Sequence, residues 1–590
     1  MIGRLRAWLT HHAGALVVLG AVVTLLAGVL RHPGERVVGR AYVDANGTQW
    51  FYDLAGRIVA GEARAEHSSL LFHPWGKDVW LHTGGNLLDA FAALPLRAAF
   101  GPVAGYDLWV AVLLMTNALG GAAIAAAMDI PAGRRWPAAL VLVLHPFVLQ
   151  ELQFGRPTQA WLAPAAFAVA ALLRMRRASH AVGAGLLVAL CGYAYWFHGL
   201  ALGACVVTAG SVHVLRTRDA GAAGRLLLAG LTAALAVAPV VLPMLGAVAS
   251  GEVPGLLALN GDGPLAPLAL RTMEGDKEGL WTYALAHATA GSLVDDEGVR
   301  WNAGTDPLGW TSLALIGAAV LVLVRTRRPA WAVAVTWVGA ALLLATGPAM
   351  PVAGGFVRNV PYLWLVEHVD AMRRWWWPGR AVAMLALMAA PAAAGLLARS
   401  DGKRHALLGL GLVAALLAEA RRDEVLPLAT WDGRGSAVLD CIREGPPGAV
   451  LNVPWTQEQA DLWLQVLHRR PILGGMLVKK PAFGPPEVPA LRASNGLLRV
   501  IDAIGEGQWR APLDIPVGAR EELRALGYGS ILARAEAFRR PRVDRSGTVR
   551  WEAEWTRPRR LLEKALGAPF AEDARFAAWS VDGGPRTCKR

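Results

Sequence analysis

The sequence predicts an all-α bundle of membrane-spanning helices followed by a C-terminal α/β domain outside the cytoplasm. Hydrophobic residues make up 54% of the 590 positions and charged residues only 17%, whereas a soluble protein carries about 25% charged residues. Apolar runs long enough to cross a bilayer recur through residues 1–420. Arg and Lys gather in alternate short loops between those runs. The low charge and the many large apolar residues exclude a disordered chain.

The apolar runs predict about eleven membrane spans, since a spanning helix needs roughly 17 to 25 apolar residues. The clearest runs are residues 13–30, 107–127, 225–249, 309–324, 329–346, 381–398 and 406–420, and the weaker ones are 137–150, 160–173, 180–197 and 199–215. Two of the weaker runs, 137–150 and 160–173, are short enough to form a re-entrant hairpin instead. The first run is expected to be a retained anchor, because Arg31-His32-Pro33 after it is a poor signal-peptide cleavage site.

Loop charge predicts the orientation, because basic residues near span ends stay in the cytoplasm. With the N-terminus inside, the inner loops carry many cations, among them Arg4, Arg6, Arg134, Arg135, Arg174, Arg176, Arg177, Arg325, Arg327, Arg328 and Arg404, and few acids. The formal net charge of +13 is then a topology signal and not a nucleic-acid footprint. An odd number of spans places the C-terminal part outside.

Two domains are expected. Residues 1–420 form the membrane domain with long outer loops at 31–106, 250–308 and 347–380, and residues 421–590 form the soluble α/β domain. In the latter, 448–453 and 528–532 have the pattern of buried strands, and 460–467 and 519–526 that of helices. The four cysteines are widely scattered, so the sequence predicts neither a disulfide framework nor a cysteine zinc site.

Several classes of protein lack their required residues here. The apolar runs hold almost no ionisable side chains between their ends, which disfavours ion-coupled transport. The sequence contains no Walker A motif, no HExxH, and no GxSxG in a helical context, which removes ATPase, zinc protease and serine hydrolase functions. Any chemistry is therefore expected at the outer membrane surface.

The first outer loop carries the most informative pattern. It contains Asp44 about 14 residues after the first span, then a predicted interfacial helix from Thr48, and later the run Phe72-His73-Pro74-Trp75-Gly76-Lys77-Asp78. This layout resembles the GT-C class of polytopic glycosyltransferases over roughly residues 1 to 400. The resemblance implies a multi-pass protein of the bacterial cytoplasmic (inner) membrane. Its activity would be transfer of a sugar from a polyprenyl-phosphate donor to an envelope lipid, glycan or protein acceptor.

The resemblance also implies a catalytic base, and Asp44 is the matching position. A placed carboxylate can take the proton of an attacking hydroxyl and stabilise an oxocarbenium-like sugar. Asp44 could instead shape a turn with Asn46-Gly47. Asp53 is the second catalytic candidate, with a solvated helix acid as its alternative. Asp44-Ala45-Asn46 offers one carboxylate where some GT-C enzymes use two acids, so no metal ligands are assigned, although a divalent metal remains an option.

A departing lipid phosphate needs fixed cations, and the guanidinium fork of arginine suits phosphate. The run 372–380 supplies Arg373, Arg374, Trp377 and Arg380. An interfacial anchor of tryptophans and snorkelling arginines would have the same composition. Further binding candidates are Trp50, His73 and Lys77 in the first outer loop, and Arg156 and His198 in short outer turns, where structural turns or an aromatic belt are the alternatives.

The competing hypothesis is a GT-C-derived scaffold without catalysis, or a flippase or binding protein for lipid-linked sugars. The transferase hypothesis expects Asp44 and the arginine-rich run to meet in one outer pocket. The expected partners are the lipid bilayer, a polyprenyl-phosphate-linked sugar and an envelope acceptor, without nucleic acid.

Overall fold

The computed structural model describes residues 2–41, 44–64, 66–79, 87–250, 293–294, 300–301, 309–346, 349–352, 355–369, 378–422, 425–455, 458–475, 484–508, 514–543, 549–583 and 588. The chain divides into two compact units. The first contains Met1–Arg40 and Asn86–Trp431, and the second contains Ala41–Gly85 and Asp432–Arg590. Residues 41–85 of the predicted outer loop 31–106 are thus grouped with the C-terminal region, although residues 86–431 separate the two in sequence.

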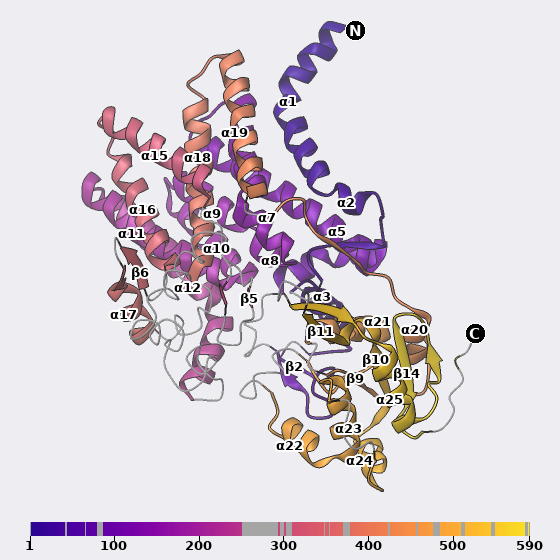
Figure 1. Ribbon diagram of the computed structural model, residues 1–590. Helices are drawn as coiled ribbons and strands as arrows, with labels where there is room; N and C mark the ends of the chain where they lie inside the picture. The colour runs from indigo at the N-terminus through magenta and orange to yellow at the C-terminus, as the bar shows by residue number, and fades with distance from the viewer. Residues whose placement is uncertain are drawn as a thin grey trace. The chain divides into compact units, whose positions relative to one another are not determined.

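The first unit is built of helices (Figure 1). They are α1 (Ile2–Leu25), α2 (Ala27–Leu30), α5 (Leu88–Ala127), α6 (Trp136–Leu144), α7 (Pro146–Gln153), α8 (Pro157–Ala160), α9 (Ala163–Leu173), α10 (Ala178–Ala194), α11 (Trp196–Thr217), α12 (Ala220–Ala249), α15 (Trp310–Arg325), α16 (Ala330–Ala345), α17 (Val360–His368), α18 (Ala383–Leu397) and α19 (Gly402–Arg422). Short strands accompany them: β1 (Arg36–Val38), β4 (Leu293–Val294), β5 (Arg300–Trp301), β6 (Ala349–Val352), β7 (Gly355–Arg358) and β8 (Thr430–Asp432).

Each predicted apolar run is helical, which confirms the mostly helical membrane region. Among the described residues, four helices are long and apolar enough to cross a membrane: Leu88–Ala127, Trp196–Thr217, Ala220–Ala247 and Gly379–Leu397. Shorter apolar helices include Ala178–Ala194, Trp310–Arg325 and Ala330–Ala345. The length and composition of these helices indicate a multi-pass membrane protein, and the count of eleven spans stays a prediction.

Helix α5 begins well before the predicted run. Residues 88–106 were expected in an outer loop, but they form the first half of a 40-residue helix. The sequence did not indicate a helix here, because this half contains Pro95 and Pro102 and proline ordinarily interrupts a helix. The chain bends at Gly101, whose φ of 79° lies in the left-handed region.

The helices also carry buried acids that do not lie in the interior of any predicted apolar run. Asp89 and Glu151 are 0% exposed, and Asp107 is 8% exposed. Asp107 accepts a hydrogen bond from the backbone N–H of Val38 (3.1 Å). Ion-coupled transport is disfavoured only for spans free of acids, and the candidate span Leu88–Ala127 contains Asp89 and Asp107.

The run 137–150 is two helices and not one. Pro146 has no N–H to donate and restricts the residue before it to extended backbone, and His145 has φ −57° and ψ 131°. The Nδ1 atom of His145 accepts the N–H of Phe147 (3.2 Å) and so caps α7. The chain then breaks again at 154–156 and between α8 and α9.

The second unit combines helices with a four-stranded sheet. Its elements are α3 (Ala45–Val59), β2 (His67–Ser68), β3 (Lys77–Asp78), α20 (Ala437–Glu444), β9 (Ala449–Val453), α21 (Glu458–His468), α22 (Glu487–Ser494), α23 (Gly496–Gly505), α24 (Ala519–Ala525), β10 (Tyr528–Arg534), β11 (Arg539–Val543), β12 (Val549–Ala553), α25 (Thr556–Leu566), β13 (Ala571–Glu572) and β14 (Phe576–Ser580).

The sheet order is β13-β14-β10-β9, with β10 parallel to β9 and antiparallel to β14. Every residue of β9, β10 and β14 is buried. The strands predicted at 448–453 and 528–532 and the helices predicted at 460–467 and 519–526 are confirmed. The parallel pair is joined through helices, as parallel strands require.

One cysteine prediction is wrong. Cys441 and Cys588 form a disulfide across 147 residues of sequence, whereas Cys191 and Cys205 are free and buried. The spacing of cysteines along a chain does not reveal which of them meet in the fold.

Candidate functional site

The polar residues with the most unusual surroundings in the first unit lie where α7 ends. Gly155 adopts φ 73° there. The N–H of Gly155 bonds the carbonyl of Leu152 (3.0 Å), and the N–H of Arg156 bonds the carbonyl of Glu151 (2.7 Å). This pair of bonds is the Schellman ending, which favours glycine at the left-handed position. It turns the chain back, so that Arg156 comes to lie beside the helix that it follows.

Arg156 faces a buried acid. Its Nη1 lies 3.7 Å from Oε2 of Glu151, and the side chains are 10% and 0% exposed. Neither carboxylate oxygen of Glu151 has a hydrogen-bond partner within the described residues. A buried carboxylate without hydrogen bonds is costly, so the positive charge of Arg156 is the main compensation that the described residues provide.

A second arginine reaches the same group from the start of α18. Arg380, in the 3₁₀ turn Pro378–Val382, is 6% exposed and donates to the hydroxyl of Tyr195. Its guanidinium carbon also lies over the rings of Tyr195 (5.4 Å) and Phe197 (5.8 Å). Tyr195 is within electrostatic range of both Glu151 and Arg156.

His198 completes the group. Its ring centroid lies 4.8 Å from that of Tyr195, edge to face. The Nε2 atom is buried and has no hydrogen-bond partner among the described residues. Three of the predicted binding residues, Arg156, His198 and Arg380, thus gather around Tyr195 and Glu151.

Sequence reasoning missed Glu151, which follows the apolar run 137–150 by one residue, and it selected His198 and not Tyr195 from the turn 195–198. A signal was present, because a glycine after a helical run followed by arginine predicts a helix ending that folds the arginine back.

The remaining candidates with described side chains belong to the second unit. Asp44 is half-buried and occupies the N-cap of α3, where its carbonyl accepts the N–H of Thr48 (2.8 Å) while its carboxylate makes no capping bond. Asp53 is ion-paired with Arg57 (2.6 Å), with side chains 14% and 10% exposed. Trp50 is 1% exposed, so its ring has no open face for a sugar in this conformation.

His73 attaches the first outer loop to the sheet region, and Lys77 packs against Phe72 of the same loop. His73 Nε2 donates to the carbonyl of Leu526 (2.9 Å), and the hydroxyl of Tyr528 donates to the carbonyl of His73. Burial lowers the pKa of His73, against the smaller raising effect of the bond to Leu526. Lys77 is 3% exposed, and its ammonium lies 5.1 Å from the ring centroid of Phe72. Both side chains are therefore engaged in packing contacts within the second unit.

Arg373, Arg374 and Trp377 lie outside the described residues. Asp44 and Arg380 belong to different units, so the predicted meeting of base and arginine run stays a prediction. Among the described residues, no group of three or more His, Cys, Asp or Glu side chains is placed to hold a metal ion.

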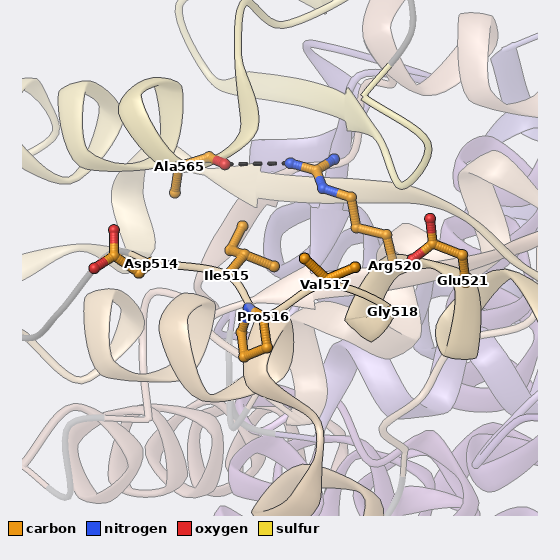
Figure 2. Close-up of a pocket in the computed structure, with 8 residues that line it drawn as sticks. All are labelled: Asp514, Ile515, Pro516, Val517, Gly518, Arg520, Glu521 and Ala565. Carbon is orange, nitrogen blue, oxygen red and sulfur yellow. Dashed lines mark hydrogen bonds between the residues drawn. The ribbon is translucent and has the colours of Figure 1, made fainter.

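A surface hollow in the second unit lies elsewhere. Figure 2 shows it between the loop from Asp514 to Gly518 and the start of α24, with Arg520 reaching the carbonyl of Ala565 (3.2 Å). None of the predicted site residues lines this hollow, and its one arginine is engaged by backbone carbonyls. It is therefore not the candidate site.

No protein-family model matches the chain, and no curated protein sequence matches it significantly. Solved structures do match it. The archaeal oligosaccharyltransferase AglB from Archaeoglobus fulgidus, solved with an inhibitory peptide and a dolichol-phosphate, matches with a TM-score of 0.50 at 11% identity. The match covers 92% of this chain and 74% of AglB.

Two further structures give somewhat lower scores. ArnT from Cupriavidus metallidurans, bound to undecaprenyl phosphate, has a TM-score of 0.48 at 13% identity and 98% coverage of both chains. The arabinofuranosyltransferase AftD from Mycobacteria has 0.49 at 18% identity, over 99% of this chain and 42% of its own. At such identities a likeness concerns the fold, and the match to AglB is the one that carries it.

Proposed function

We propose that this chain, which has the GT-C fold expected from its sequence, is a membrane glycosyltransferase that takes its sugar from a polyprenyl-phosphate donor. The observation that carries the proposal is the group of Arg156, Arg380, Tyr195 and His198 around the buried Glu151. Buried arginines attract an anionic ligand strongly, because the low-dielectric surroundings of an apolar helical unit strengthen the interaction between charges. A lipid phosphate would be such a ligand, because the guanidinium fork of arginine binds phosphate through two parallel hydrogen bonds.

The proposed reaction is a displacement at the anomeric carbon. The acceptor oxygen forms a bond to that carbon as the bond to the phosphate oxygen breaks, and the phosphate leaves with the electron pair. Asp44 would take the acceptor proton as general base. Arg156 and Arg380 would stabilise the charge that grows on the leaving phosphate, which is the kind of interaction that accelerates a reaction. Arg373 and Arg374 would extend this cation set.

The second unit would lie outside the cytoplasm, with the N-terminus inside and about eleven spans in the membrane. The disulfide Cys441–Cys588 supports this orientation, because disulfides persist in oxidising compartments and are rare in the cytosol. The proposed setting is a bacterial inner membrane, and the acceptor would be an envelope lipid, glycan or protein.

The test uses the purified full chain in nanodiscs with radiolabelled undecaprenyl-phosphate pentoses and hexoses, plus a membrane extract as acceptor. Asp44→Asn is expected to lower turnover by roughly 10²- to 10⁴-fold, the usual contribution of a general base, while leaving the binding of farnesyl phosphate unchanged. Asp514→Asn, at an exposed position of the same unit, is the matched control. If Asp53→Asn shows the larger loss in a folded protein, Asp53 and not Asp44 is the base.

The alternative is a scaffold, flippase or binding protein for lipid-linked sugars, for which the buried arginines alone would suffice. Retention of the labelled lipid without transfer or hydrolysis in any acceptor extract favours it over the transferase. Full turnover by a folded Asp44→Asn variant removes the proposed base. Turnover measured with a chelator and then with added Mg²⁺ or Mn²⁺ decides whether a divalent metal takes part.

A further inference from the structure

The first part of α5, residues 88–100, exposes an apolar face. Phe91 is 37% exposed, and Phe100 at the end of the segment is 58% exposed. Further exposed positions follow Phe91 at intervals of three and four residues, which is the spacing of one helix face. These positions are Ala92, Pro95, Ala98 and Ala99. The outward face of the segment therefore consists of aromatic, alanine and proline side chains.

The charged residues of the segment lie on its inward side. They are Asp89 and Arg97. Asp89 is 0% exposed, and its carboxylate accepts a hydrogen bond from the hydroxyl of Thr158 (2.7 Å). Arg97 is half-buried and donates to the carbonyl of Pro102 (2.9 Å). A helix facing water would bury the phenylalanines and expose the carboxylate. Surrounding lipid favours the opposite arrangement, because charged side chains in a bilayer turn toward the protein interior.

A sharp bend separates this segment from the rest of α5. Gly101 leaves the helical conformation, with φ 79° and ψ 174°. A Cβ atom added to Gly105 would lie 2.5 Å from Cα of Arg97, so the start of the second part packs directly on the backbone of the first. In a straight helix these two residues would be about 12 Å apart along the axis. The two parts of α5 therefore run in different directions.

The lengths of the two parts decide how often α5 can cross a bilayer. Residues 88–100 extend about 20 Å and residues 103–127 about 38 Å, at the rise of an α-helix. The hydrocarbon core is about 30 Å thick, so only the second part is long enough to cross. Exposed apolar side chains continue on that part at Val112 (41%) and Leu119 (59%). The outward face of the first part thus adjoins, along the same helix, a surface that is expected to meet lipid.

We propose that residues 88–100 lie within the leaflet in which α5 begins to cross the bilayer, and that their outward face binds phospholipid acyl chains. Bilayer lipid is the partner because this face carries no charged side chain and adjoins the exposed apolar side chains of the crossing part. The inference goes beyond the proposed sugar transfer and does not depend on it. The inward Asp89 then connects the lipid-embedded segment to Thr158, two residues after Arg156.

The test places one fluorescent label on the outward face of the full chain in lipid nanodiscs. Two of the four cysteines form a disulfide and the other two are buried, so an added surface cysteine is the thiol that reacts in the folded protein. Ala92→Cys and Ala99→Cys are each labelled with the dye NBD. Lipids with a spin label near the headgroup or near the end of the acyl chain then quench a dye at a shallow or a deep position.

Two matched variants calibrate the measurement. Val112→Cys lies about 14 Å into the crossing part and therefore near the bilayer centre. Val517→Cys, at a fully exposed position of the second unit, is the control for water. The shallow spin label is expected to quench Ala92→Cys and Ala99→Cys roughly twofold more than the deep one, because the segment stays in one leaflet. Val112→Cys should show the reverse order, and Val517→Cys should be quenched by neither.

A second measurement uses a charged maleimide before labelling. Ala92→Cys and Ala99→Cys should react roughly tenfold more slowly than Val517→Cys, because a charged reagent is excluded from the apolar part of the bilayer. Each of these substitutions adds a thiol to an exposed alanine and leaves the packed face unchanged. Ala98→Cys, also exposed, replaces either variant that does not fold.

Four results would overturn the inference. Quenching of both labels by the deep spin label, in the order shown by Val112→Cys, would mean that the segment crosses the bilayer. Quenching by iodide and not by spin-labelled lipid would place the face in water. Labels that neither quencher reaches would mean that protein, such as a second copy of the chain, covers the face. Loss of lipid quenching on addition of farnesyl phosphate would assign the face to the donor chain. The first three results leave the proposed function untouched.

Discussion

Asn117 on α5 gives the sharpest prediction about how the broken helices are held. It is 0% exposed. Its Nδ2 donates to the carbonyls of Ala160 (2.8 Å) and Leu142 (3.4 Å), and its Oδ1 accepts the N–H of Ala163 (2.8 Å). It therefore satisfies the backbone where α8 ends and α9 begins, as irregular backbone in an apolar setting requires. Asn117→Leu keeps the approximate volume and removes all three bonds.

The three lost bonds do not cost the same. The bond to the Leu142 carbonyl is the longest (3.4 Å) and therefore the weakest. The Ala160 carbonyl keeps a second donor, the N–H of Leu162 (3.0 Å), so its loss is small. The N–H of Ala163 is left buried without its partner, which costs about 1 to 3 kcal/mol. Polar pairs in membrane proteins average less, about 0.6 kcal/mol. The expected loss in the free energy of unfolding is therefore about 2 kcal/mol.

The assay is reversible unfolding in mixed SDS micelles, followed by tryptophan fluorescence. Thr116→Val is the matched control, because Thr116 on the same turn accepts one bond from Trp161 Nε1 (3.0 Å) and should cost less than about 1 kcal/mol. An Asn117→Leu protein within about 0.5 kcal/mol of the wild type, or less affected than Thr116→Val, would refute the reasoning, since experimental error in such differences is of that size.

Three further predictions concern single features. Gly155→Ala should lower the free energy of unfolding by about 1 to 2 kcal/mol, because φ 73° is strained for alanine, and it should weaken farnesyl phosphate binding. The control is Gly133→Ala, whose added methyl group meets no atom within 4 Å and should change neither quantity. Equal effects of the two substitutions would contradict the capping role of Gly155. Burial lowers the pKa of His73 below 6.5, so the unfolded chain binds a proton that the folded unit does not, and the stability of the second unit should be complete above pH 6.5 and fall below it. In thermal unfolding, His73→Gln should reduce the dependence of this stability on pH. An unchanged dependence would mean that a group other than His73 causes it. Replacing Cys441 and Cys588 by serine should destabilise the second unit by about 2 to 4 kcal/mol, because the disulfide between them is lost. When the wild type is unfolded without a reductant, a maleimide should react with two of the four cysteines, since the other two form the disulfide.

Part of the fold could be predicted because it depends on local composition. A segment buried in lipid needs an unbroken apolar run, so these runs predicted the positions of the helices in the first unit. Short apolar runs likewise predicted the buried strands at 449–453 and 528–534. Proline obscured the first half of α5, since its local preference opposes the helix that tertiary packing keeps.

The candidate site was predicted only in its pieces. Arg156, His198 and Arg380 were recognised as polar residues at outer turns, but nothing along the chain connects Glu151 with Arg380 or Asp89 with Thr158. Contacts between residues hundreds of positions apart leave no periodic pattern, because they arise when separately formed helices pack. The sequence alone determined which segments are apolar, and so the class of the fold. The packing decided which charges share a low-dielectric environment, which cysteines meet, and that the first outer loop belongs with the C-terminal sheet.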